Sequence, residues 1–306
     1  MEQTSSMTAL VSAFARAYHA KTRDVKIFDD TLAARLFSEA EYAQIAQSMA
    51  SGVQFFRPGF QGTPEEALRQ IADGQLSPSP LGRAAFAEAA LQNAARIGAK
   101  QYVILGAGYD TFAYRQPDWA KKLQIFELDL PATATDKQAR LARAGLSVPP
   151  NVHFPDADLT KARCLTALAA HPAFDKGKPA FCALLGLTYY LPRESFSSLL
   201  AELSKTLCGG SSIAFDYPDE NSYNEKAGER AKKQALLAGG AKEAMRACYS
   251  YRDMETLLDA HGFLIYEHLT PEQITAQYFK AHNAAAPAPM TAFDNVNYCL
   301  AVKEIR

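Results

Sequence analysis

The stretch Gln101-Tyr-Val-Ile-Leu-Gly-Ala-Gly-Tyr-Asp-Thr111 decides the fold of this chain. The apolar residues 102–105 predict a short buried strand, and Gly106-Ala107-Gly108 directly after them predict a tight turn. Glycine lacks a Cβ atom, so the backbone can bend sharply there and a ligand can approach it closely. In a strand-turn-helix unit of an α/β sheet, an adenosine-bearing cofactor binds at such a turn. The alternative is an ordinary strand-turn-helix unit without a ligand.

Asp129 is the second residue that points to an adenosine cofactor. A strand expected over residues 123–130 closes on Asp129, and the interval from Gly106 is 23 residues (129 − 106 = 23). A carboxylate about 20 residues after the glycines is placed to accept hydrogen bonds from the ribose hydroxyls. The dinucleotide fingerprint also needs a glycine at its sixth position, where Thr111 stands here. The missing glycine disfavours a pyrophosphate, so S-adenosylmethionine is expected, and a nicotinamide-dependent oxidoreductase is the alternative.

Composition sets the class of protein. The chain has 306 residues, of which 48% are hydrophobic and 21% charged, and its formal net charge is −1. These values predict one large soluble domain with a small appendage, and they give no support for a nucleic-acid or membrane partner. The five cysteines are scattered without a CxxC spacing, so we expect reduced thiols and no metal site. A polar N-terminus and the lack of an apolar run of ~20 residues favour a cytoplasmic location.

Helix and strand patterns alternate over most of the chain and predict an α/β fold. We expect a doubly wound, seven-stranded Rossmann-like sheet over residues 81–306 and an N-terminal helical cap over residues 1–80. Strands are expected at 102–105, 123–130, 151–158, 180–187, 212–217, 262–268 and 296–303. Helices are expected at 8–18, 30–37, 39–49, 82–97, 132–144, 161–170, 193–207, 222–245 and 253–261, with a loop at 284–289.

Part of the expected cap has the composition of a lid. Residues 52–80 are rich in Gly, Pro and Gln and carry Phe55, Phe56 and Phe60. Loops over a rigid scaffold often carry substrate contacts, so this segment, which is expected to be rich in loops, is a candidate cap or lid. The N-terminal segment as a whole is predicted to close over the acceptor. A helical extension that packs only for stability fits the same pattern.

Several motifs occur together in the order of one known family. The chain resembles class I S-adenosylmethionine-dependent methyltransferases, specifically the leucine carboxyl methyltransferase-like family and its bacterial small-molecule and polyketide O-methyltransferase branch. The resemblance spans residues 8–303 and implies a methyltransferase sheet with S-adenosylmethionine as cofactor. The motifs are Leu105-Gly-Ala-Gly-Tyr-Asp-Thr111 with Tyr114-Arg115, Phe126-Glu-Leu-Asp-Leu-Pro131 with Lys137, Asp158-Leu159, Gly186-Leu-Thr-Tyr-Tyr-Leu-Pro192, Gly262-Phe263 and, near the N-terminus, Thr8-Ala-Leu10, Arg16-Ala17 and Phe28-Asp-Asp30.

The resemblance also implies roles for residues that hold the cofactor. Arg83 matches the family arginine that pairs with the methionine carboxylate, a task that suits the forked donors of a guanidinium. Without the resemblance, Arg83 would be interpreted as a solvated helix residue. Asp129 matches the acid that binds the ribose. The cradle around it is expected to consist of Gly106, Ala107, Gly108 and Leu130.

Residues after the third and fourth strands complete the implied cofactor site. Asp158 and Leu159 match the pair that holds the adenine through a polar contact and apolar packing, although Asp158 can also serve as a helix N-cap. Leu185 stands where the eukaryotic carboxyl methyltransferases have a glutamate, so it is expected near the cofactor without a charged contact. This departure disfavours a protein C-terminus as acceptor and favours a small molecule.

The acceptor decides which catalytic residues are needed. Methyl transfer from a sulfonium is an in-line displacement, in which the enzyme mainly positions the two partners. A carboxylate is already ionised at neutral pH, whereas a phenol or alcohol needs a base such as histidine. None of the six histidines stands at the carboxyl end of the fourth strand, so we expect them to be structural or on the surface, which favours a carboxylate. His19 is the best candidate for a base, because it lies in the expected cap. Tyr190 and Tyr217 are the candidates for orienting the acceptor, although aromatic rings at strand ends also simply pack.

The sequence therefore predicts an O-methyltransferase that acts on a carboxylate of a small molecule. Methylation of a phenol or hydroxyl group is the main alternative, and a non-catalytic protein that retains the cofactor fold is a further one. The oligomeric state is left open.

Overall fold

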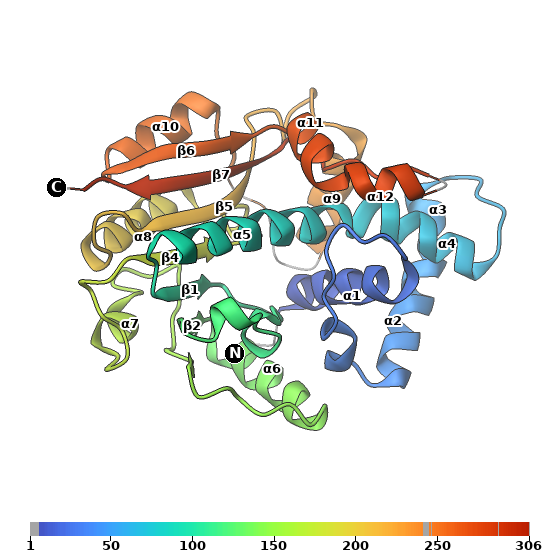
Figure 1. Ribbon diagram of the computed structural model, residues 1–306. Coiled ribbons are helices and arrows are strands. Elements are labelled where there is room, and N and C mark those ends of the chain that lie inside the picture. The colour runs from blue at the N-terminus through green and yellow to red at the C-terminus, as the bar shows by residue number, and fades with distance from the viewer. Residues whose placement is uncertain (1–5, 241–244, 246, 287, 306) are drawn as a thin grey trace.

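The computed structural model describes residues 6–240, 245, 247–286 and 288–305. A seven-stranded sheet runs through the molecule with helices on both faces (Figure 1). The strands stand in the order β3-β2-β1-β4-β5-β7-β6. Their bounds are β1 Gln101–Leu105, β2 Gln124–Leu128, β3 Val152–His153, β4 Ala180–Leu184, β5 Ser212–Pro218, β6 Phe263–Leu269 and β7 Val296–Lys303. The predicted seven-stranded α/β sheet is confirmed.

The central strands form because both of their faces are buried. Every residue of β1 and β4 is buried, as parallel sheets covered by helices require. Alternate residues of β1 point to opposite faces, so Tyr102 and Ile104 join the core beneath α5 (Pro78–Ile97) while Val103 and Leu105 join the core on the other face. This face includes α8 (Arg193–Thr206), whose leucines pack against it.

The strand order places a switch point next to the glycine turn. β1 pairs in parallel with both β2 and β4, so the chain leaves β1 at the point where the strand order reverses. Ligands of open α/β sheets bind at the carboxyl ends of strands at such a point. β7 is antiparallel to β5 and β6, which differs from the all-parallel 3-2-1-4-5-6 order of dinucleotide-binding sheets.

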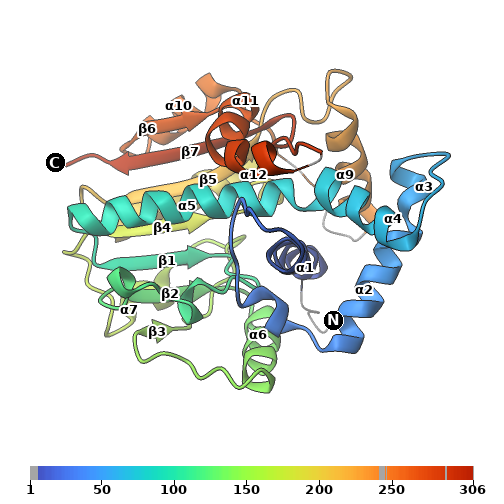
Figure 2. The same cartoon turned by 45° about the vertical axis from the view of Figure 1, so that its right-hand side comes forward.

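The N-terminal segment is helical and lies beyond the carboxyl ends of the strands. Figure 2 shows α1 (Met7–Thr22) end-on below α5, next to the ends of β1 and β2. The other helices of this segment are η1 Ala33–Leu36, α2 Glu39–Ser51, α3 Val53–Phe56, α4 Pro64–Ile71 and the π-helix η2 Ala72–Leu76. The division into a cap and a cofactor domain at residue 80 stays a prediction, and α5 runs across that position.

The expectation of a loop-rich segment at residues 52–80 is wrong. A capping box between Thr63 and Glu66, with Pro64 in the first turn, starts α4. Proline is tolerated in a first helical turn because its missing N–H has no partner there anyway. For the same reason Pro78 and Pro80 begin α5 four residues earlier than the expected start at residue 82.

Three further elements differ from the sequence prediction. β3 has only two residues, because Pro155 cannot donate to a sheet ladder and ends the expected strand 151–158. The helix expected at 161–170 is shortened to α7 Thr166–Ala170. Residues 271–285 were not predicted to be helical, yet a capping box at Thr270 starts a helical run there. Its parts are α11 Pro271–Ile274, the π-helix η5 Thr275–Phe279 and α12 Lys280–Ala285.

The remaining helices connect the strands. They are η3 Phe112–Tyr114, η4 Asp118–Ala120, α6 Pro131–Arg143, α9 Glu229–Gly240 and α10 Tyr251–Asp259. The helix predicted at 222–245 is therefore shorter, and its last part lies outside the described residues. In the part of the chain that the structure describes, none of the helices has the length and apolarity to cross a membrane.

Candidate cofactor and acceptor site

The glycine turn folds back onto the neighbouring strand. Gly106 and Gly108 have φ angles of 68° and 49°, in the left-handed region that favours glycine. The amides of Gly106 and Ala107 donate to the carbonyl of Leu128 at 2.9 and 3.1 Å. A Cβ atom on Gly108 would lie 3.1 Å from the Cβ of Ala9 in α1. The turn is thus shaped by glycine, and the cap helix lies directly over it.

Asp129 lies against this turn. Its Oδ2 accepts a hydrogen bond from the Gly108 amide at 2.6 Å, and its Oδ1 accepts one from the Leu130 amide at 2.7 Å. Burial raises the pKa of Asp129 above its usual value, although the two amides act in the opposite direction. The structure therefore brings together Gly106, Ala107, Gly108, Asp129 and Leu130, as the sequence predicted.

Asp158 and Leu159 reach the same edge of the sheet through the backbone. The Ala157 amide donates to the Asp129 carbonyl at 3.3 Å, which ties their segment to the end of β2. The Asp158 carboxylate accepts hydrogen bonds from Thr160, and these lower its pKa. Leu159 is buried in the core beneath β1. Asp158 is not the N-cap of a helix that begins at Leu159, because α7 begins only at Thr166.

Arg83 lies on the turn that follows β4. A Cβ atom on Gly186 would be 2.3 Å from Arg83 Nη1, so the guanidinium packs directly on the backbone of this glycine. Arg83 Nη1 is 3.5 Å from Asp216 Oδ2, and Nη2 is 3.5 Å from Ser12 Oγ. Both distances are long for hydrogen bonds, so the guanidinium retains donor capacity for an anionic ligand. Leu185, next to Gly186, is half-buried against the core beneath α5.

Asp216 is a site residue that the sequence reasoning missed. It is fully buried in β5, and its Oδ1 accepts a hydrogen bond from the Gly186 amide at 2.6 Å. Its Oδ2 accepts one from the Tyr189 hydroxyl at 2.9 Å, and its carbonyl accepts one from Thr188 at 2.5 Å. One carboxylate thus connects β5, the turn after β4 and Arg83. The available signal was a charged residue inside an otherwise apolar strand.

The structure separates the two tyrosines that were predicted to act together. Tyr217 follows Asp216 in β5 and therefore points to the opposite face of the sheet. It is fully buried there, and its hydroxyl lies 2.8 Å from Nε2 of His268. Tyr190 is half-buried against the core on the Arg83 side, with its ring 6.2 Å from that of Tyr189. Tyr190 remains a candidate for the acceptor site, whereas the position of Tyr217 favours packing.

His19 is not placed as a catalytic base. It is fully buried in α1, and its Nε2 accepts a hydrogen bond from the Ile27 amide at 2.9 Å. Its ring centroid is 5.2 Å from that of His282 in α12. Burial above all, and then the neighbouring His282, lower the pKa of His19 to about 3. The lone pair that would take a proton is already used within the fold.

The buried neutral His19 is expected to make the protein sensitive to acid. Its pKa is about 3 in the folded chain and 6.5 by ordinary standards, so only the unfolded chain takes up the proton between these values. The stability that the neutral His19 contributes is therefore fully present above about pH 6.5 and is lost as the pH drops. The free energy of unfolding should fall by about 2 kcal/mol between pH 7.5 and pH 5. Urea unfolding at both pH values measures this loss. His19→Gln should show a smaller loss than the unsubstituted protein.

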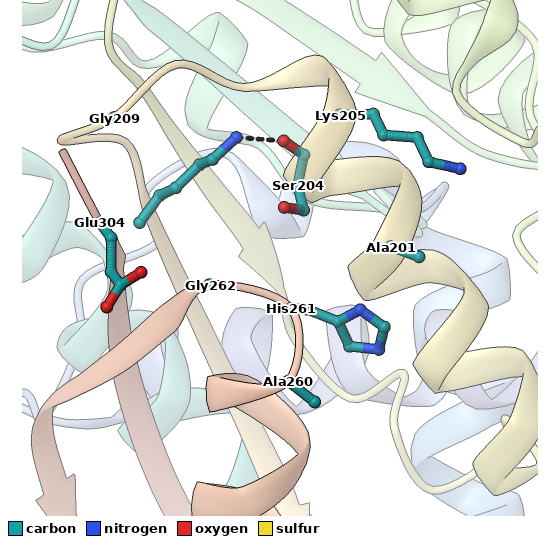
Figure 3. Close-up of a pocket in the computed structure, with 9 residues that line it drawn as sticks. Ala201, Ser204, Lys205, Gly209, Ala260, His261, Gly262 and Glu304 are labelled. Carbon is teal, nitrogen blue, oxygen red and sulfur yellow. Dashed lines mark hydrogen bonds between the residues drawn. The ribbon is translucent and has the colours of Figure 1, made fainter. Parts of the chain in front are cut away.

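A pocket of about 440 Å³ lies at the ends of the strands opposite to the glycine turn (Figure 3). Its lining includes Gly209, just before β5, and Lys303 at the end of the antiparallel β7, so it is at the amino ends of the parallel strands. Lys303 Nζ donates to the carbonyls of Ser204 and Leu207 at the end of α8, where a cation stabilises a helix terminus. Cofactors bind at the carboxyl ends, so we do not assign this pocket to the cofactor.

Comparison with known proteins identifies the family. The leucine carboxyl methyltransferase family model matches residues 9–204. YktD of Bacillus subtilis, provisionally described as an S-adenosyl-L-methionine-dependent methyltransferase, is 40% identical over 308 residues, which is 98% of each chain. A protein of Mycobacterium sp. strain KMS with the same description is 31% identical over 221 residues, 68% of this chain and 65% of that protein.

Solved structures show the same fold at low sequence identity. A provisionally described methyltransferase from Thermobifida fusca YX has a TM-score of 0.53 and 15% identity, covering 98% of this chain and 96% of that one. A DUF574 family protein from Streptomyces avermitilis has a TM-score of 0.54 and 17% identity, covering 83% and 96%.

These comparisons agree with the sheet. The family match covers well over half of the chain, and the antiparallel β7 does not fit a dinucleotide-binding sheet, which sets aside the oxidoreductase alternative. The chain therefore belongs to the leucine carboxyl methyltransferase family of S-adenosylmethionine-dependent methyltransferases.

Proposed function

We propose that this methyltransferase transfers a methyl group to a carboxylate of a small molecule. When bound, S-adenosylmethionine supplies an electrophilic methyl group on a positive sulfur. Asp129 is assigned to accept hydrogen bonds from the ribose hydroxyls in addition to those from its backbone donors, because a carboxylate has lone pairs for both. Arg83 is suited to hold the methionine carboxylate, because its two described contacts are both 3.5 Å long and it faces a switch point of the sheet. Asp158 and Leu159 are assigned to the adenine.

The residues fit this cofactor in charge and in shape. The Asp129 carboxylate lies on the glycine turn after β1, and the Arg83 guanidinium lies on the turn after β4, the strand beside β1, as a ribose diol and a methionine carboxylate need. Leu187, next to Gly186, is close to the glycine turn, since a Cβ atom on Gly106 would be 3.2 Å from its Cδ1. Leu185 supplies only apolar surface nearby. The chain thus offers polar contacts to the two ends of the cofactor and apolar contacts between them.

The burial of His19 carries the proposal for a carboxylate acceptor. A phenol, with a pKa of about 10, needs a base to become a nucleophile at neutral pH. The histidine that the sequence favoured for this task has its Nε2 engaged by a backbone amide. A carboxylate, with a pKa of about 4, needs only alignment with the methyl carbon and exclusion of water. Tyr190 is assigned to orient this carboxylate by a hydrogen bond.

A screen of small carboxylic acids and phenols with mass detection of the products tests this function. We expect methyl esters and a turnover rate that is nearly flat between about pH 6 and pH 8, because no group essential to the proposed reaction titrates there. Methylation of phenols alone, with a rate that rises through a histidine-like pKa, would refute the carboxylate proposal and favour the hydroxyl alternative.

Replacement of Tyr190 by phenylalanine tests the acceptor contact with a matched control. Tyr190→Phe removes one hydroxyl on the Arg83 side of the sheet, and turnover of the ester-forming reaction is expected to fall about tenfold through loss of a hydrogen bond to a charged group. Cofactor affinity should stay unchanged in calorimetry. Tyr217→Phe removes the same hydroxyl on the opposite face, so its turnover should match the unsubstituted enzyme within about twofold. Equal losses in both variants would contradict the assignment.

A further inference from the structure

Asp30 is the centre of a buried polar cluster outside the cofactor contacts described above. It is 1% exposed, and its Oδ2 accepts a hydrogen bond from Arg16 Nε of α1 at 2.8 Å. Its Oδ1 accepts hydrogen bonds from Thr111 Oγ1 at 2.5 Å and from the Ala33 amide at 3.0 Å. One carboxylate therefore joins α1, the start of η1 and the segment that follows the glycine turn.

The cluster holds both ends of that segment. Arg16 Nη2 donates to the carbonyl of Tyr109, the residue directly after Gly108, at 2.7 Å. Thr111, two residues further on, donates to Asp30. Residues 109–111 are thus fixed from one side by a single ion pair, and the position of the Gly108 amide follows from theirs. This amide is the one that Asp129 binds.

A second layer connects the cluster to the helix that carries Arg83. Arg115 Nε donates to Thr111 Oγ1 at 3.0 Å and lies 3.6 Å from Asp30 Oδ1. The Arg115 guanidinium also makes a forked contact with Glu88, which lies in α5. The cap, the glycine turn and α5 therefore meet in one hydrogen-bonded network.

The charge of Asp30 is retained despite its burial. Burial alone would raise the pKa of this carboxyl, but Arg16 and Arg115 outweigh that effect and hold the pKa below its usual value. A buried ion pair is weak evidence for stability, because desolvation offsets much of the attraction. Fixing the geometry of a neighbouring site is a role that such a pair can perform.

We propose that Asp30 is a positioning residue, which holds the backbone after the glycine turn through Arg16 and Thr111 and so couples docking of the cap helix to cofactor affinity. This inference rests on the proposed placement of the cofactor at Gly106, Gly108 and Asp129. Because Ala9 of α1 lies over Gly108, a looser ion pair would both shift the turn and lift the helix that covers it.

Calorimetric titration of the full chain with S-adenosylhomocysteine tests the proposal without an acceptor. Asp30→Asn keeps the shape of the side chain and removes its charge, and the dissociation constant is expected to rise about tenfold, as for the loss of one charge-assisted hydrogen bond. The control is Asp73→Asn, which breaks another cap ion pair, to Arg23 at 2.6 Å, that makes no contact with the glycine turn. Its dissociation constant should change less than about twofold.

Thermal unfolding separates positioning from stability. Both variants are expected to lower the melting temperature, whereas only Asp30→Asn should weaken binding at a temperature where both are fully folded. If Asp30→Asn does not fold, Thr111→Val removes only the hydroxyl between Asp30 and Arg115, and a rise of about threefold in the dissociation constant is expected. Unchanged affinity in the folded variant, or equal losses in the control, would overturn the proposal. If Asp129→Ala also binds normally, the cofactor placement itself fails.

Discussion

Replacement of Arg83 by lysine is expected to weaken binding of S-adenosylmethionine by about ten- to a hundredfold. The ammonium group keeps the positive charge beside the buried Asp216 but cannot make the two parallel hydrogen bonds of a guanidinium to a carboxylate. Lysine is preferred to alanine because an unpaired buried carboxylate would destabilise the fold by about 3–5 kcal/mol. Isothermal titration calorimetry measures the change.

Methylthioadenosine supplies the control for this variant. It shares the nucleoside of the cofactor and lacks the methionine carboxylate, so its affinity should not change in Arg83→Lys. Arg193→Lys, at an exposed arginine that pairs with Asp253, should leave both affinities unchanged. A loss for methylthioadenosine as large as the loss for S-adenosylmethionine would show that Arg83 does not bind the carboxylate.

Replacement of Asp129 by alanine should affect both ligands. The variant loses charge-assisted hydrogen bonds to the ribose worth roughly 1.5–3 kcal/mol, about ten- to a hundredfold in affinity. It also leaves the amides of Gly108 and Leu130 without their carboxylate partner, so the turn is held less tightly. Calorimetry with S-adenosylmethionine and methylthioadenosine should show similar losses, because both contain the ribose.

The control for Asp129 is an exposed carboxylate with a local role. Asp118→Asn removes a charge that pairs with Lys121, three residues further along the chain. Its affinities should stay within about twofold of the unsubstituted enzyme. Unchanged binding in Asp129→Ala, or a loss confined to S-adenosylmethionine, would refute the ribose assignment. Arg83→Lys and Asp129→Ala thus test the two ends of the cofactor, the methionine carboxylate and the ribose, independently.

Local patterns predicted the sheet well and its irregular parts poorly. A short apolar run that ends in Gly106 and Gly108 indicates a buried strand followed by a tight turn, since few other sequences permit a strand to turn so sharply. The segment at 271–285 was missed because its helical signal is a capping box at Thr270 with a short apolar pattern behind it. β3 was overestimated because Pro155 was not weighed against the apolar residues before it.

Some candidate site residues could be predicted from sequence spacing, and others could not. Gly108 and Asp129 are 21 residues apart, and their contact follows from adjacent parallel strands, which the spacing of the sequence predicts. Tyr217 was selected and Asp216 was missed, although both stand near the same strand end. Their faces are set by where the helices dock, and a strand buried on both sides carries no polar and apolar alternation to indicate it.

The sequence alone determined the class of sheet, the glycine turn and the acidic end of the second strand, because these depend on residue type and short-range spacing. Only the tertiary structure decided which buried polar groups meet. Arg83 and Asp216 are 133 residues apart, and Thr111 and Asp30 are 81 apart. Such pairs depend on how helices pack across the sheet, and a buried charge is stable only with the partner that this packing supplies.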